Sequence, residues 1–320
     1  MRTAITVAVL QFGLLLPGPG LAKTSPSPAV SCNATGAPPM TTVNPATARL
    51  DPHGGRLLQF NQNGVTRYAN LNLPREAQSN QSKGRKWPLL IYLHGSRATP
   101  ESIYRFGKNL FALHDTFPLS ANPDTHGFIV LSPEGRRARP AGALTGTGFH
   151  WDEWYRDPQS NLDALAVDHF LDETIATGLV DTKRVYVFGW SNGAYMAALY
   201  GTWRSDRIAA IAQYAGADPF SREPCPVPFN GKRKVPLVLL RNLCDALVDC
   251  ATTSQWIATL QKMEWPFAHH NLGTTGHLTA PDAACDGHCG KIKGLYEHIR
   301  FPQPDAFDAM LKFLKQHETP

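Results

Sequence analysis

The 320-residue sequence has no stripe of basic residues and no internal repeat, and its charged fraction is only 18%. Its 31 Lys and Arg exceed its 26 Asp and Glu, which gives a net charge of +5, but the positive residues are scattered. Nucleic-acid binding usually needs basic residues gathered on one face. The composition therefore argues against nucleic acid as a partner, and 42% hydrophobic residues exclude a disordered chain.

The apolar stretch at the N-terminus is too short to cross a bilayer. Residues 4–16 are apolar and follow the positively charged Arg2, whereas a membrane-spanning helix needs about 20 residues. Gly20 and Ala22 are small residues at the two positions that a signal peptidase reads. We therefore expect residues 1–22 to be a signal peptide. The mature protein is then secreted, either extracellular or periplasmic, and has no membrane association.

Cysteine pairs of the CxxC type, which are typical of metal sites, are also lacking. The six cysteines are Cys32, Cys225, Cys244, Cys250, Cys285 and Cys289. An even number in an exported chain favours disulfides, for which 15 pairings are possible. Cys244 with Cys250 and Cys285 with Cys289 are close in sequence, which suggests two local bridges. A metal site that includes His288 is the competing interpretation, and we expect neither a metal nor an organic cofactor.

The hydrophobic pattern divides the mature chain into an extension and one folded domain. Residues 23–54 are rich in Pro, Ser, Thr and Ala and have no regular period, so we interpret them as an N-terminal extension. Across residues 55–320, β-like apolar runs alternate with stretches of helical spacing. This alternation predicts an α/β fold with a mostly parallel central sheet and helices on both faces. We find no sign of a second domain.

The predicted elements begin with an antiparallel hairpin around Asn63-Gly64, a strong signal for a tight turn. Further strands are predicted at residues 87–93, 127–131, 184–188, 208–214 and 235–240. Helices are predicted around residues 162–170, 194–199, 256–263 and 304–316. We expect residues 292–296 to form the last strand, directly before the closing helix, with residues 266–271 as the alternative.

The sharpest chemical motif is Gly189-Trp-Ser191-Asn-Gly193. It follows a predicted strand and opens a helix of small residues, which is the setting of a nucleophile elbow. Bulky residues two positions before or two positions after Ser191 would clash in so tight a turn. The helix start behind the serine directs backbone N–H groups toward developing negative charge. An ordinary tight turn with an idle serine is the alternative interpretation.

A serine hydroxyl is a weak nucleophile at neutral pH, so it needs a base that is oriented by an acid. In this architecture the acid and then the histidine follow the serine along the chain. We expect Asp245 to be the acid, because it lies in the loop at the C-terminal end of a predicted strand. Asp249 and Asp305 are the alternatives, and a turn-capping role would explain Asp245 without catalysis.

Several histidines follow this acid, and we expect His298 to be the base. It lies between the predicted strand at residues 292–296 and the closing helix, where this architecture places its catalytic histidine. His277, in a Gly- and Thr-rich loop, is the alternative base. It fits if residues 266–271 form the last strand instead.

His94-Gly95-Ser96 follows a predicted strand and forms the expected second side of an oxyanion hole. The expected donors are the backbone N–H of Ser96 and the backbone N–H of Asn192, the residue after the nucleophile. An ordinary glycine turn at the end of the strand would explain the same residues without a catalytic role.

Three tryptophans are the expected substrate contacts. Trp151 and Trp154 lie in an aromatic loop that would form a platform for a ring or a polymer chain. The equally supported alternative is a loop anchored by the burial of both residues. Trp190, inside the elbow motif, is the third expected contact.

Together these motifs resemble the secreted α/β-hydrolase esterases related to polyhydroxybutyrate depolymerases and feruloyl esterases. The resemblance rests on Leu93-His-Gly-Ser96, on Pro133-Glu-Gly135, on the two loop tryptophans and on residues 180–197. It covers residues 87–217 well and the C-terminal part loosely. It implies an α/β-hydrolase fold and supports Asp245 as the acid, because Asn242-x-x-Asp245-x-x-Val is similar to the family's Gly-x-x-Asp-x-x-Val.

The resemblance implies a serine esterase that hydrolyses carboxylic esters through an acyl-enzyme. Polyesters, feruloyl or acetyl esters of polysaccharides, and small esters are the substrates to consider. The implied nucleophile, base and acid are Ser191, His298 and Asp245, although the Gly-rich stretch around the family's histidine is missing near His298. A secreted serine peptidase is one alternative, disfavoured because no extra domain is present to hold a peptide. A non-catalytic binding protein on the same fold is the other.

Overall fold

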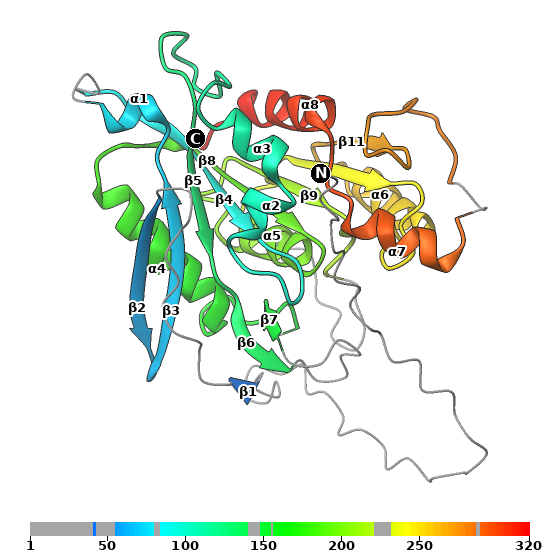
Figure 1. Cartoon of the computed structure of the whole chain (residues 1–320), viewed down its shortest axis with the longest axis horizontal. Helices are drawn as coiled ribbons and strands as arrows, with labels where there is room; N and C mark the ends of the chain where they lie inside the picture. The colour runs from blue at the N-terminus through cyan, green and yellow to red at the C-terminus, as the bar shows by residue number, and fades with distance from the viewer. Residues whose placement is uncertain are drawn as a thin grey trace, which may run out of the picture.

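The computed structural model of the protein describes residues 41–42, 55–79, 84–139, 148–154, 156–220, 232–285 and 289–320. The predicted signal peptide and most of the predicted extension therefore lie outside the described residues, as do Cys32, Cys225 and His288. In the described part, an eight-stranded sheet runs through the molecule. Figure 1 shows it extending from the hairpin of β2 (Arg56–Gln62) and β3 (Val65–Asn72) on one side to β11 (Phe267–Leu272) on the other.

The strand order across this sheet is β11-β10-β9-β8-β4-β5-β3-β2. Neighbours from β11 to β5 are parallel, whereas β3 is antiparallel to both β5 and β2. The remaining strands of the sheet are β4 (Trp87–Leu93), β5 (Ile129–Pro133), β8 (Val180–Trp190), β9 (Ala210–Tyr214) and β10 (Leu237–Asn242). The predicted mostly parallel sheet with an N-terminal antiparallel hairpin is confirmed.

Local sequence explains both the interior of this sheet and the hairpin at its edge. Every side chain of β4 is buried, because the strand lies between two neighbours and under helices on both faces, and its sequence is accordingly apolar throughout. In the hairpin, Asn63 and Gly64 have φ of 52° and 84°. A two-residue turn with both central residues at positive φ matches the twist of the flanking strands, and Asn-Gly adopts it readily.

Helices cover both faces of the sheet, and each face has its own apolar core. The helices that contribute to one core are α4 (Leu162–Ala176), α5 (Asn192–Trp203) and α6 (Cys250–Lys262). Those that contribute to the other are α2 (Ser102–Arg105), α3 (Lys108–Leu113) and α8 (Pro304–Lys315). None of the helices within the described residues is long and apolar enough to cross a membrane.

A few short elements were not predicted. Helix α1 (Arg75–Gln78) follows the hairpin, and a small antiparallel sheet joins β1 (Thr41–Thr42), β6 (Arg136–Arg139) and β7 (Gly148–His150). Strand β1 belongs to the sequence interpreted as an extension. Elements of two to four residues are too short to show a hydrophobic period, so sequence patterns do not reveal them.

The prediction of a last strand at residues 292–296 is wrong. These residues belong to helix α7 (Lys291–Ile299), and the last strand is β11, which the alternative at residues 266–271 anticipated. Ile292, Tyr296 and Ile299 are spaced four and three residues apart, which places them on one face of a helix. All three are exposed. Their apolar character suggested a buried strand, but their spacing is helical.

The two suggested local disulfides are also wrong. Cys244 is bonded to Cys289 and Cys250 to Cys285, with Cα–Cα distances of 5.3 and 5.6 Å. Cys244 lies in the turn after β10 and Cys250 at the start of α6, and each lies opposite a cysteine of the segment before α7. Closeness in sequence therefore misled the pairing. Cys285 and Cys289, on which the metal interpretation rested, are both part of disulfides.

A buried ion-pair network fixes the chain around β6 and the start of α4. The fully buried carboxylate of Asp163 accepts hydrogen bonds from Arg67 at 2.9 Å, from Arg136 at 3.1 Å and from the backbone N–H of Asp152 at 2.7 Å. Burial by itself would raise the pKa of Asp163, but Arg136 and Arg67 hold that pKa below its usual range. The network ties β3, β6 and α4 to the loop that carries Trp151.

We expect Asp163→Ala to lower the free energy of unfolding by about 3–5 kcal/mol, because it leaves buried guanidinium charge uncompensated. Asp172→Ala on the same helix is the matched control. Asp172 pairs with Arg207 at the surface, so its loss should cost less than about 1 kcal/mol in urea unfolding. Because the folded-state pKa of Asp163 is depressed, its contribution is present above about pH 4 and is lost as the pH falls further. Equal losses in the two variants would contradict the network.

Candidate active site

The Gly-x-Ser-x-Gly segment forms a sharp turn between β8 and α5. Ser191 has φ 54° and ψ −123°, a strained conformation for a residue other than glycine. Its backbone N–H donates to the carbonyl oxygen of Tyr214 in β9 at 2.9 Å, so the neighbouring strand holds the turn. The serine is half-buried at the start of α5. The strand–turn–helix setting predicted for a nucleophile elbow is therefore present.

Close backbone contacts require both glycines of the motif. A Cβ on Gly189 would lie 2.0 Å from the carbonyl oxygen of Gly193, and one on Gly193 would lie 2.1 Å from that of Leu93. No side chain fits at these distances, so β4, the turn and α5 meet here only because glycine lacks a Cβ.

His298 lies between Ser191 and Asp245. Its Nε2 is 2.9 Å from Oγ of Ser191, and its Nδ1 is 2.7 Å from Oδ2 of Asp245. The exposed fractions of His298 and Asp245 are only 4% and 6%. This arrangement suits a base that accepts the serine proton at Nε2 while a carboxylate binds its Nδ1–H.

The turn after β10 fixes the other carboxylate oxygen of Asp245. Oδ1 accepts hydrogen bonds from the backbone N–H groups of Leu247 at 2.8 Å and Val248 at 2.9 Å. Turn capping was the alternative interpretation of this residue, and it is present together with the bond to His298. One oxygen shapes the turn, so the other is held toward the imidazole.

The alternative acid and base have other partners. Asp249 caps α6, because its Oδ1 accepts a hydrogen bond from the backbone N–H of Thr252 at 2.7 Å. His277 and Asp305 bind each other at the surface, with Nδ1 2.9 Å from Oδ1, and their side chains are 57% and 40% exposed. The structure thus brings His298 to the serine, although the predicted reason was wrong: this histidine lies on α7, a helix between β11 and α8.

The two predicted oxyanion-hole residues come from different elements. Asn192 is the first residue of α5, a position where a backbone N–H has no acceptor within the helix. Ser96 follows β4 and is half-buried in the loop that leads to α2. The side chain of Asn192 also binds the backbone of Trp151, accepting from its N–H at 2.7 Å and donating to its carbonyl oxygen at 3.1 Å. The start of α5 is thereby fixed to the aromatic loop.

His94 has a specific role that the sequence did not reveal. This fully buried imidazole accepts a hydrogen bond at Nε2 from the backbone N–H of Gly135 at 3.0 Å, and its Nδ1 is 2.8 Å from the carbonyl oxygen of Gly95. The neutral tautomer protonated at Nδ1 satisfies both bonds. His94 therefore fixes the loop before Ser96. The joint presence of the His-Gly and Pro-Glu-Gly motifs was the only available signal.

Trp151 and Trp190 are packed inside the molecule, with exposed fractions of 1% and 5%. The indole N–H of Trp151 donates to the carbonyl oxygen of His94 at 2.8 Å, and that of Trp190 donates to the carbonyl oxygen of His298 at 3.2 Å. Their rings are covered by neighbours, so the expected substrate contacts are not supported for these two residues. Burial fits the alternative of an anchored loop. Trp154 is half-buried, and its role stays a prediction.

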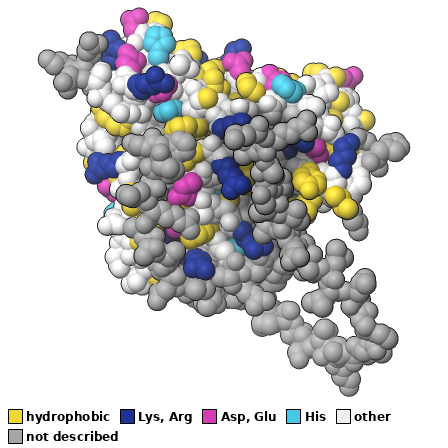
Figure 2. Space-filling model, viewed as in Figure 1, with side chains coloured by type: hydrophobic (Ala, Val, Ile, Leu, Met, Phe, Trp, Pro, Cys, Tyr) yellow, Lys and Arg dark blue, Asp and Glu magenta, His cyan; other side chains and the backbone are white. Residues whose placement is uncertain are grey.

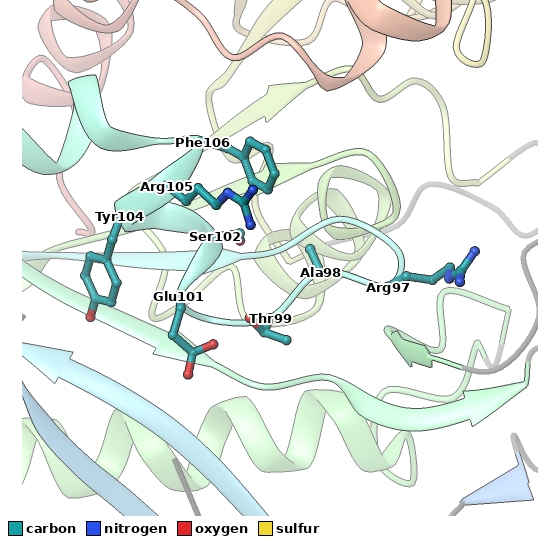
Figure 3. Close-up of a pocket in the computed structure, with 8 residues that line it drawn as sticks. All are labelled: Arg97, Ala98, Thr99, Glu101, Ser102, Tyr104, Arg105 and Phe106. Carbon is teal, nitrogen blue, oxygen red and sulfur yellow. The ribbon is translucent and has the colours of Figure 1, made fainter. Parts of the chain in front are cut away.

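A pocket of about 420 Å³ lies beside the loop that carries Ser96 (Figure 3). The residues that line it belong to this loop, to α2 and to the position directly after α2: Arg97, Ala98, Thr99, Glu101, Ser102, Tyr104, Arg105 and Phe106. Figure 3 shows Arg105 running beside Phe106, whose ring centroid is 5.4 Å from the guanidinium carbon, and Arg97 projecting away from the other lining residues. The ring of Phe106 lies 5.9 Å from that of Trp190, the neighbour of the serine, so the pocket adjoins the candidate site.

Comparison with known sequences finds a partial relative. No family model matches this chain. Poly(3-hydroxyalkanoate) depolymerase C from Paucimonas lemoignei is 29% identical over 129 residues, which are 40% of this chain. The match covers only 28% of that depolymerase.

Solved structures show which fold this is. A ferulic acid esterase shares 16% identity at a TM-score of 0.54, over 82% of this chain and 98% of its own. The ferulic acid esterase of the anaerobic fungus Anaeromyces mucronatus shares 16% identity at a TM-score of 0.52, over 83% and 99%. A thermostable esterase shares 16% identity at 0.54, over 83% and 64%. The predicted α/β-hydrolase fold is confirmed, as is the similarity to depolymerases and feruloyl esterases that the motifs suggested.

We expect Gly189→Ala to destabilise the protein by about 3 kcal/mol or to prevent folding, because the added methyl group would overlap a carbonyl oxygen. Gly273→Ala is the matched control. A Cβ at Gly273 meets nothing within 4 Å, so its effect should stay below about 0.5 kcal/mol. Urea unfolding measures both variants. Wild-type stability of Gly189→Ala would contradict the close contact in the turn.

Proposed function

We propose that the protein is a secreted serine esterase that hydrolyses carboxylic esters through an acyl-enzyme. The observation that carries this proposal is the hydrogen-bonded series from Ser191, at the turn between β8 and α5, through His298 on α7 to Asp245 after β10. The name of the partial relative, a depolymerase of a polyester, and the esterases that share the fold support the same reaction class.

In the proposed reaction, Oγ of Ser191 attacks the ester carbonyl carbon while Nε2 of His298 takes the hydroxyl proton. Asp245 stays ionised and stabilises the imidazolium through Nδ1–H. The backbone N–H groups of Ser96 and Asn192 would donate to the oxyanion of the tetrahedral intermediate. The C–O bond to the leaving alcohol then breaks, and the alkoxide receives the proton from His298. Water then attacks the carbonyl carbon of the acyl-serine while His298 again takes a proton. The bond to Oγ of Ser191 breaks, the carboxylic acid product leaves, and Ser191 regains its proton from His298.

We also propose that the protein is exported, to the periplasm or the extracellular space. Residues 1–22 have the sequence features of a signal peptide. The two disulfides in the described part of the chain support export, because such bonds persist in oxidising compartments and are rare in the cytosol.

The triad proposal is tested with short nitrophenyl esters and the purified mature protein. We expect Ser191→Ala, His298→Ala and Asp245→Ala each to lower kcat by about 10³-fold or more, since each removes part of one proton-transfer unit. His277→Ala and Asp249→Ala are the matched controls and should keep kcat within about twofold. An organophosphonate should label the wild type at Ser191 only. Amide hydrolysis without ester hydrolysis would favour a peptidase, and an unlabelled, inactive wild type would favour a binding protein.

The surface beside the proposed base favours an extended apolar ester. Ile292, Tyr296 and Ile299 lie on the outer face of α7 and are 79%, 62% and 43% exposed, whereas His298 on the same helix is buried. Leu247, in the neighbouring turn, is 63% exposed. Figure 2 shows hydrophobic side chains gathered over α7, on the right of the view. Exposed apolar patches mark binding surfaces, so among the possible substrates we place aliphatic polyesters ahead of feruloyl, acetyl and small esters.

We expect I292S/Y296S to slow the hydrolysis of a poly(3-hydroxybutyrate) film about tenfold, because a polymer surface loses its apolar contacts. Hydrolysis of nitrophenyl acetate, which needs no such surface, should change less than twofold. Leu165→Ser, which alters an exposed apolar residue of α4, is the control and should leave both rates unchanged. Equal losses on film and soluble ester would argue against a polymer-binding role.

A further inference from the structure

A covalent bridge joins the segments that hold the proposed acid and base. Cys244 directly precedes Asp245, and its sulfur is bonded to Cys289. Cys289 lies two residues before the start of α7, the helix that carries His298. The disulfide therefore links the turn of the acid to the start of the helix of the base, across 45 residues of sequence.

Non-covalent contacts also join the turn after β10 to α7. The backbone N–H of Ala246 donates to the carbonyl oxygen of Gly294 in α7 at 3.3 Å. A Cβ on Gly294 would lie 2.4 Å from that of Ala246, so the helix packs directly on the turn. Asn242 connects both segments again, because its Oδ1 accepts from the backbone N–H of Cys244 at 2.9 Å and its Nδ2 donates to Oε2 of Glu297 at 3.0 Å.

The two ends of α7 are held differently. At its C-terminal end, the indole of Trp190 donates to the carbonyl oxygen of His298, and the hydroxyl of Tyr214 donates to the carbonyl oxygen of Arg300, directly after the helix. At its N-terminal end, Gly290 provides no capping side chain. A helix of nine residues is marginal in water unless tertiary contacts hold it. The N-terminal end of α7 therefore depends on the bridge and on the Ala246 contact.

We propose that Cys244–Cys289 is a positioning disulfide, which keeps His298 within hydrogen-bond reach of both Asp245 and Ser191. This inference rests on the esterase proposed above. Proton transfer is sensitive to displacements of about 1 Å at the base, whereas binding of a small ester is much less so. Loss of the bridge therefore lowers kcat more than it changes KM.

The second disulfide provides a matched control. Cys250–Cys285 closes a loop of similar length, 35 against 45 residues, so removing either bridge relaxes the unfolded chain to a similar extent. The cysteine of this second bridge that comes first in the chain, Cys250, is the first residue of α6 and is not adjacent to Asp245. If the two bridges only stabilise the fold, removing either should change the melting temperature and kcat to the same extent. If Cys244–Cys289 positions His298, its removal should lower kcat more than removal of Cys250–Cys285 does.

The experiment compares C244A/C289A with C250A/C285A in the full mature chain. We expect C244A/C289A to lower kcat on nitrophenyl acetate about tenfold or more with KM within about threefold, and C250A/C285A to keep kcat within about twofold. The melting temperatures should fall similarly. The downfield proton NMR signal of the His298 Nδ1–H shared with Asp245 should weaken in C244A/C289A alone. Equal kcat in the two variants, or wild-type kcat in C244A/C289A, overturns the proposal.

A second variant covers a failure of C244A/C289A to fold. In Gly294→Ala the added Cβ would lie 2.4 Å from that of Ala246 and 2.9 Å from the carbonyl oxygen of Cys244, so α7 is pushed away from the turn of the proposed acid. We expect a lower melting temperature and a kcat that falls more than the kcat of C250A/C285A, with KM within about threefold. Wild-type kcat in this variant would overturn the inference. If the wild type hydrolyses no ester, the esterase proposal fails and the NMR signal alone tests the positioning role of the disulfide. Loss of the signal only in the variants that disturb α7 supports this role. Retention of the signal in those variants refutes it.

Discussion

The hydrogen bond between His298 and Asp245, at 2.7 Å, is the interaction on which the candidate site depends. Both side chains are buried, and a buried carboxylate or imidazole is costly unless its hydrogen bonds are satisfied. The surrounding structure meets that requirement with two backbone N–H groups for the remaining oxygen of Asp245 and with Ser191 for the second nitrogen of His298. A disulfide and a close helix contact then fix the distance between acid and base.

The other side of the site depends on buried polar groups of a different kind. Asp163 fixes Arg136 and the backbone N–H of Asp152. The adjacent Trp151 binds the side chain of Asn192 at the start of α5 and the carbonyl oxygen of His94 before the Ser96 loop. The ion pairs that stabilise the fold therefore also position both proposed oxyanion donors. The same residues therefore serve both the stability of the fold and the geometry of the proposed site.

Predictions from the sequence succeeded where a local pattern determines a local structure. The Asn63-Gly64 turn, the apolar run of β4 and the glycines around Ser191 each follow from residues within one element or one turn. They fail in the C-terminal part, where the apolar residues of α7 predict a buried strand but form a helix. The prediction of His298 as the base depends on a strand directly before it, and that strand is in fact helix α7. His298 nevertheless reaches Ser191, because α7 packs against the turn after β10.

The sequence by itself determined the alternation of strands and helices, the elbow around Ser191 and the place of a candidate acid in the turn after β10, because periodicity and turn chemistry act over a few residues. Only the tertiary structure decided which histidine meets the serine, which cysteines pair, and that Trp151 and Trp190 are buried anchors. Each of these depends on segments far apart in the chain that pack against one another. Such packing is a property of the whole fold, and no local pattern of residues specifies it.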